Sequence, residues 1–101
     1  MKVLLVCNAG MSTSMLMQKM QEVVNARGVN VSVDARGYRD ALRDFVDYDV
    51  VLVGPQVRHQ FEQLKKKTKG VCACDLINMK DYGMMDGEKV LDQAIRLYEE
   101  G

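Results

Sequence analysis

The chain has 101 residues, with 14 Lys and Arg side chains against 14 Asp and Glu, so its formal net charge at pH 7 is zero. This length suits one domain, and a composition of 48% hydrophobic and 28% charged residues is that of a soluble globular protein. The neutral balance argues against nucleic acid as a partner, and the first apolar run, residues 3–7, is far too short to span a membrane. We expect one cytoplasmic domain over residues 1–101.

Two hydrophobic periods alternate along the first half, as is typical of strands and helices arranged around a parallel sheet. Residues 2–7 (KVLLVC) form an almost wholly apolar run, which predicts a central strand. Residues 12–27 carry apolar side chains at helical spacing, and Gly28 follows as a stop signal. Residues 29–35 alternate apolar and polar side chains, which predicts a strand at the edge of the sheet.

The second half repeats the alternation. Residues 38–45 have a helical spacing of apolar side chains, and residues 50–53 (VVLV) predict a buried strand that ends at Gly54 and Pro55. Further helical and extended patterns predict a helix around residues 57–64, a fourth strand at 71–74, a long loop through 79–83 and a final helix at 90–98.

These elements predict an α/β domain in which four parallel strands, in the order 2-1-3-4, carry helices on both faces, as in a flavodoxin-like fold. The direction of winding then reverses between the first and third strands. Ligands of open α/β sheets bind beyond the carboxyl ends of the strands at such a reversal. The loops that follow Cys7 and Val53 are therefore the predicted functional loops.

The loop after Cys7 has the composition of an anion-binding turn. Cys7 is followed by small and hydroxyl-bearing residues that run into the predicted helix, namely Asn8, Ala9, Gly10, Met11, Ser12, Thr13, Ser14 and Met15. Backbone N–H groups in such a turn, together with the positive end of a helix, bind phosphate without a basic side chain. Taken singly, Cys7 can also be a small buried hydrophobe and Ser12 or Ser14 a helix cap. Their combination at the reversal point favours a nucleophilic cysteine.

Three motifs resemble those of one protein family. The run C-N-A-G-M-S-T-S begins at Cys7, G-P-Q follows the third strand at Gly54, Pro55 and Gln56, and Y-G-M-M-D-G precedes the last helix at residues 82–87. In this order, the motifs resemble the enzyme IIB subunit of the bacterial phosphoenolpyruvate-dependent sugar phosphotransferase system, lactose/cellobiose type. The resemblance covers essentially the whole chain.

The resemblance implies a function and a set of partners. Cys7 would accept a phosphoryl group from a phosphohistidine of a IIA protein and pass it to a sugar bound by the membrane-embedded IIC permease. Residues 8–15 would surround the phosphate, and the Gly54–Pro55–Gln56 loop would support them. No metal or other cofactor is required, and the domain would sit at the inner face of the membrane through its IIC partner. Because the sequence has no long exposed apolar stripe that demands a dimer, we expect a monomer.

Two other functions remain open at this point. Low-molecular-weight phosphatases and arsenate reductases resemble this architecture, but their C-x5-R-[ST] motif has an arginine where this chain has Thr13. A bidentate guanidinium for phosphate is therefore missing, which disfavours hydrolysis. The other alternative is a non-catalytic module whose loop only senses phosphate.

Four residues outside the cysteine loop invite functional assignments. Cys72 and Cys74 form a C-x-C pair, which lacks the usual spacing of metal ligands, so we expect both thiols to pack in the core. His59 follows the G-P-Q motif, and we expect a structural or solvent-facing role for it, because the family's relay histidine belongs to the donor protein. Gln56 is the stronger candidate, since its amide can bond either to backbone or to phosphate.

Overall fold

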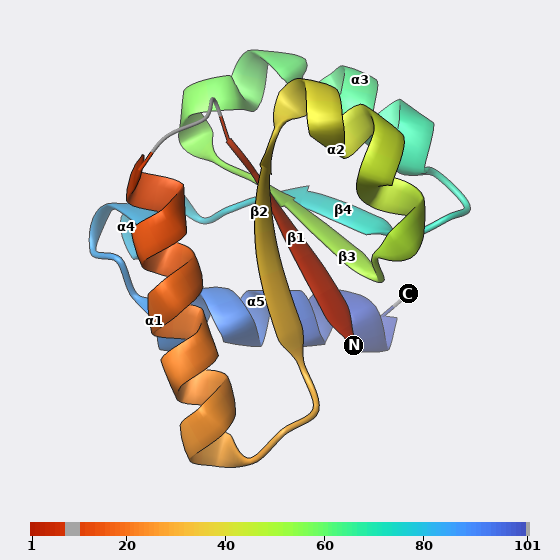
Figure 1. Ribbon diagram of the computed structural model, residues 1–101. Helices are drawn as coiled ribbons and strands as arrows, with labels where there is room; N and C mark the ends of the chain where they lie inside the picture. Colours follow the sequence, from red (N-terminus) through yellow and green to blue (C-terminus); the bar gives the residue numbers. More distant parts are fainter. Residues whose placement is uncertain (8–10, 101) are drawn as a thin grey trace.

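The computed structural model describes residues 1–7 and 11–100, and for Met11 and Ser12 it describes the backbone alone. Four parallel strands form one sheet in the order β2-β1-β3-β4, which confirms the predicted topology (Figure 1). Their bounds are Lys2–Cys7 for β1, Ser32–Gly37 for β2, Val50–Val53 for β3 and Ala73–Leu76 for β4.

Helices cover both faces of the sheet (Figure 1). The long helices α1 (Met11–Arg27) and α5 (Gly87–Glu100) pack on one face, and α2 (Tyr38–Asp44) and α3 (Phe61–Thr68) pack on the other. Two 3-10 helices, η1 (Phe45–Asp47) and η2 (Pro55–Gln60), flank β3. The short helix α4 (Met79–Gly83) lies near the start of α1.

The core has two halves because successive residues of β1 point to opposite faces. Val3 and Leu5 pack with apolar residues of α1 and α5, whereas Leu4 and Val6 pack with those of α2 and α3. All four side chains are fully buried, as expected for a central strand covered on both sides. Cys7 follows Leu5 by two residues, so its side chain belongs to the α1/α5 face.

Backbone turns shift two strands from their predicted positions. Residues 28–31 complete the end of α1, where the Gly28 and Val29 amides bond to the Val24 carbonyl, so β2 starts at Ser32 and not at residue 29. Gly70 adopts a φ of +82° in the turn that follows α3, and the Val71 and Cys72 amides bond to the Thr68 carbonyl. The fourth strand therefore runs over Ala73–Leu76 instead of residues 71–74.

The helices also differ from the prediction in three places. Residues 79–83 form α4 instead of a loop, because the Asn78 side chain accepts hydrogen bonds from the amides of Lys80 and Asp81 and caps a helical turn. The last helix starts at Gly87, three residues before Val90, and the region after Pro55 is a 3-10 helix that precedes α3. Within the described residues, no helix is long and apolar enough to cross a membrane.

Candidate functional site

Cys7 is the last residue of β1 and lies at the carboxyl end of the sheet, between β2 and β3. Only 4% of the Cys7 residue is exposed to solvent. Gly37 is its direct partner on β2, and Val53 pairs with Val6 on β3, so the same register places Gly54 on the other side of Cys7. The Gly54 amide bonds to the Val6 carbonyl at 2.8 Å, which continues the ladder. Neither neighbouring strand therefore places a side chain beside the Cys7 thiol.

Helix α1 begins at Met11, so only residues 8–10 separate it from the end of β1. The predicted phosphate-binding residues Asn8, Ala9 and Gly10 lie outside the described residues, as do the side chains of Met11 and Ser12. The first turn of α1 contains no acidic residue. Because the amino end of a 17-residue helix carries a positive partial charge, this end of the sheet suits an anion.

The remaining predicted loop residues differ in where their side chains lie. Thr13 is fully buried, and its hydroxyl oxygen lies 3.4 Å from that of Tyr82. Ser14 is exposed and Met15 is 54% exposed. The Thr13 hydroxyl thus faces the protein interior, and any phosphate contact from this position would come from its backbone amide.

The loop after β3 contains the second predicted motif. Gly54 is buried, Pro55 starts η2, and the exposed Gln56 donates a hydrogen bond from Nε2 to the Tyr82 hydroxyl at 2.6 Å. A Cβ added at Gly54 would lie 3.2 Å from the Val6 carbonyl oxygen and 3.1 Å from Gln56 Oε1. Glycine at this position therefore leaves room for both the Gln56 side-chain amide and the Val6 carbonyl.

Tyr82 is a site residue that sequence reasoning missed. It is 8% exposed, belongs to α4, and contacts both Gln56 of η2 and Thr13 of α1 through its hydroxyl. The Y-G-M-M-D-G motif drew attention to this segment but gave no role to the tyrosine. The structure thus joins all three motifs at one end of the sheet.

The other chemically interesting residues lie away from Cys7. Cys72 and Cys74 are half-buried and pack against the α2/α3 half of the core, which agrees with the packing role predicted for them. Burial raises the pKa of each thiol to about 11. His59 is exposed on η2. In the part of the chain that the structure describes, no group of three His, Cys, Asp or Glu side chains is placed to hold a metal ion.

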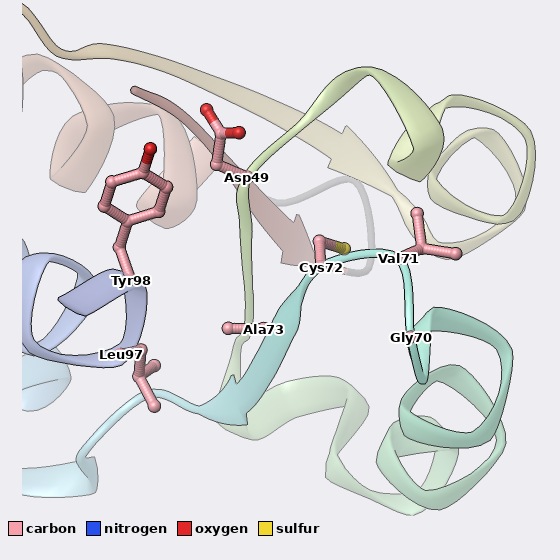
Figure 2. Close-up of a pocket in the computed structure, with 7 residues that line it drawn as sticks. All are labelled: Asp49, Gly70, Val71, Cys72, Ala73, Leu97 and Tyr98. Carbon is pink, nitrogen blue, oxygen red and sulfur yellow. The ribbon is translucent and has the colours of Figure 1, made fainter. Parts of the chain in front are cut away.

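A cavity of about 380 Å³ opens at the amino end of the sheet. Figure 2 shows Leu97 and Tyr98 of α5 on one side of this pocket and Cys72 and Ala73, at the start of β4, on the other. Asp49, which also lines it, directly precedes β3 and accepts a hydrogen bond from the Lys2 amide at 2.8 Å. The pocket is therefore at the opposite end of the strands from Cys7.

The fold and the site define a flavodoxin-like α/β domain with a cysteine where the winding of the sheet reverses. A family model described as the lactose/cellobiose-specific IIB subunit of the PTS system matches residues 2–93. The chain belongs to this family of phosphotransferase-system IIB subunits. Its members are phosphotransferase components that take part in sugar uptake with IIA and IIC partners.

Individual relatives match over nearly their whole length. The oligo-beta-mannoside-specific EIIB component of Bacillus subtilis (strain 168) is 38% identical over 97 residues, which cover 95% of this chain and 94% of that protein. The galactose-specific EIIB component of Lactococcus lactis subsp. cremoris (strain MG1363) is 41% identical over 100 residues, with 92% of each chain covered.

Two solved structures resemble the whole chain. The solution structure of a cellobiose-specific IIB component from Borrelia burgdorferi is 39% identical, with a TM-score of 0.84 over 99% of this chain and 93% of that one. The lactose-specific IIB domain from Streptococcus pneumoniae has a TM-score of 0.85 over 97% of each chain at 22% identity, a similarity that shows the fold.

Proposed function

We propose that residues 1–101 form one phosphotransferase domain in which Cys7 carries the phosphoryl group as phosphocysteine. The observation that carries this proposal is the position of Cys7: it ends a buried strand, glycines flank it on both neighbouring strands, and α1 begins four positions further along the chain. A thiol in this place lies at the carboxyl end of the sheet, near a helix end that favours anions.

The reaction consists of two in-line transfers. In the first, the Cys7 sulfur attacks the phosphorus of a phosphohistidine on the IIA partner, so that the S–P bond forms as the P–N bond breaks and the thiol proton ends on the leaving imidazole or in solvent. In the second, a sugar hydroxyl oxygen attacks the same phosphorus and gives up its proton to solvent or to a base of the permease, while the S–P bond breaks and Cys7 leaves as the thiolate. Both steps depend chiefly on positioning and charge stabilisation.

The phosphate would be held by the turn from Asn8 to Met15, through its backbone amides and the hydroxyls of Ser12 and Ser14. Gly54, Pro55 and Gln56 would support the turn from the adjacent strand end. Neutral donors suit a carrier, because they stabilise a dianionic intermediate without the tight bidentate grip of an arginine. Thr13 stands where the phosphatase motif has that arginine, and its side chain is buried against Tyr82, which supports transfer over hydrolysis.

We further propose that the domain works in the cytoplasm as a monomer. It would reach the inner face of the membrane through a IIC permease, which would hold the sugar. The sugar itself would then meet this chain only at the phosphoryl group, so specificity for one carbohydrate would belong to the permease.

The test is to incubate the protein with phosphoenolpyruvate, the general phosphotransferase proteins and a IIA partner, and to follow the intact mass. The proposal predicts one added phosphoryl group that persists in water and is lost when permease-containing membranes and sugar are added. Rapid hydrolysis of an aryl phosphate by the protein alone would contradict it in favour of a phosphatase. Failure to accept phosphate from a loaded donor would favour a phosphate-sensing module.

A further inference from the structure

We propose that Tyr82 is a positioning residue for the transfer at Cys7, because its hydroxyl ties the loop after β3 to the first turn of α1. This inference rests on the proposed function for its kinetic consequence. It concerns a residue that is 75 positions from Cys7 in the sequence and that makes its contacts from a different helix.

The link to the β3 loop is the stronger of the two contacts. Gln56 Nε2 donates to the Tyr82 hydroxyl oxygen at 2.6 Å, a short distance for a hydrogen bond to a neutral oxygen. Gln56 lies two residues beyond Gly54, whose amide bonds to the carbonyl of Val6, the residue before Cys7. A contact that holds the Gln56 side chain therefore also restrains the backbone from Gly54 to Gln56, which lies next to the proposed nucleophile.

The second contact reaches the helix that follows the cysteine. The hydroxyls of Tyr82 and Thr13 lie 3.4 Å apart, longer than an ordinary O–H···O bond, and either oxygen can be the donor. Thr13 is fully buried, so its hydroxyl depends on partners within the protein. Tyr82 therefore lies between the two segments that the proposed phosphate site requires.

The helix that carries Tyr82 is itself held in place by contacts with α5 and the end of β4. Asn78 caps α4, and the Asn78 amide donates to the side-chain oxygen of Gln93 on α5 at 3.2 Å. Gln93 is buried and also donates to the Leu76 carbonyl oxygen at the end of β4, at 2.7 Å. This connection anchors α4 to α5 and to the end of β4, and the tyrosine ring packs in the α1/α5 half of the core.

A substitution that removes only the Tyr82 hydroxyl tests the positioning role without disturbing the packing of the ring. Tyr82→Phe keeps the ring in the core and breaks both contacts. Tyr48→Phe is the matched control: Tyr48 is also buried, its hydroxyl donates to Asp34 Oδ2 at 2.7 Å, and it lies at the amino end of β3, away from Cys7. Each variant loses one hydrogen-bonded tyrosine hydroxyl, and the two hydroxyls lie at opposite ends of the sheet.

We expect Tyr82→Phe to lower the maximal rate of Cys7 loading by roughly 5- to 20-fold, with the KM for the loaded IIA donor unchanged. Tyr48→Phe should load at the rate of the wild type. Gln56→Ala should slow loading as well, and the double variant should be little slower than Tyr82→Phe alone, because Tyr82→Phe already breaks the link to Gln56. If the two substitutions slowed loading by factors that multiply in the double variant, or if Tyr82→Phe loaded at the wild-type rate, the inference would be overturned.

A second measurement tests the link without any donor protein. The Val57 amide bonds to the Gly54 carbonyl at 3.1 Å inside the restrained loop, so its hydrogen exchange should be several-fold faster in Tyr82→Phe and unchanged in Tyr48→Phe. Equal exchange in the two variants would overturn the structural link. If the wild type accepts no phosphoryl group, the proposed function fails, and Val57 exchange still decides whether Tyr82 restrains the loop.

Discussion

Cys7 and Gly37 are direct partners at the carboxyl ends of β1 and β2, so the residue beside the proposed nucleophile has no side chain. Partners in a parallel register point to the same face, and a side chain at position 37 would therefore project alongside the Cys7 thiol. Among the residues that the structure describes, a Cβ built at Gly37 meets only the Cys7 carbonyl oxygen, at 3.8 Å, an ordinary contact. Its backbone, with φ −70° and ψ 167°, is open to any residue.

This relationship predicts a size limit at position 37. Gly37→Ala should leave both stability and the loading of Cys7 close to wild type. Gly37→Leu should fold but load at least about tenfold more slowly, because the larger side chain occupies the space that a donor imidazole needs. Loading reactions quenched at set times, at one donor concentration, measure the rate of Cys7 loading, and thermal unfolding measures the stability of each variant. Equal loading by the leucine variant would mean that the donor approaches from elsewhere.

A second prediction concerns the contact between α1 and α5. A Cβ at Gly87 would lie 2.7 Å from the backbone carbon of Lys19 and 2.8 Å from the Met20 nitrogen, so Gly87→Ala forces the two helices apart. We expect a loss of about 1–3 kcal/mol in the free energy of unfolding, despite the better helix propensity of alanine. Gly83→Ala in α4 is the control, since no atom of the described residues lies within 4 Å of its Cβ position. Denaturant titration should find that variant unchanged or slightly more stable.

The thiols of Cys72 and Cys74 should be poorly reactive. Because burial raises the pKa of each to about 11, only about one thiol in a thousand is ionised at pH 8, and the thiolate is the reactive form. Iodoacetamide should therefore modify them far more slowly than a free cysteine peptide, and the rate should rise about tenfold per pH unit towards pH 10. Peptide mass spectrometry gives each rate separately. Modification of either residue at the rate of the peptide would contradict the burial that the structure shows.

Alkaline pH should destabilise the fold, because burial raises the pKa values of several acidic side-chain groups. Burial and the hydrogen bond to Asp34 raise the pKa of Tyr48 to about 12, above the usual value near 10, and the two thiols lie near 11. The unfolded chain therefore loses these protons before the folded one does, so stability is fully present at neutral pH and falls between about pH 9 and 12. Denaturant titrations across this range should find a shallower fall in Tyr48→Phe. An identical slope in that variant would contradict the assignment to Tyr48.

The sheet was largely predictable because its central strands are encoded locally. The apolar runs that became β1 and β3 have the predicted bounds, and the reversal between them fixed which loops lie beyond the carboxyl ends. The edge strands start later than predicted. Gly28 and Gly70 take left-handed conformations in turns that include the first residues of each predicted strand. Those turns depend on bonds to the preceding helix, which an alternation of side chains does not reveal.

The site was predictable only in part. Cys7 and the β3 loop follow from strand ends and motif spacing, but the contact between Gln56 and Tyr82 joins residues 26 positions apart and leaves no periodic signal. The helix that carries Tyr82 was missed because its five residues are too few to show a helical spacing of apolar side chains. Asn78 followed by Asp81 was the available sign of a capped turn.

The most direct test compares two cysteine variants of the chain in the loading reaction. Cys72→Ser with Cys74→Ser leaves Cys7 as the only thiol, and Cys7→Ser leaves the other two. With phosphoenolpyruvate, the general phosphotransferase proteins and a IIA donor, intact-mass measurement should find one phosphoryl group on the first variant and none on the second. A phosphoryl group on the Cys7→Ser protein, or an unmodified Cys7 in the first variant beside a loaded donor, would contradict the account.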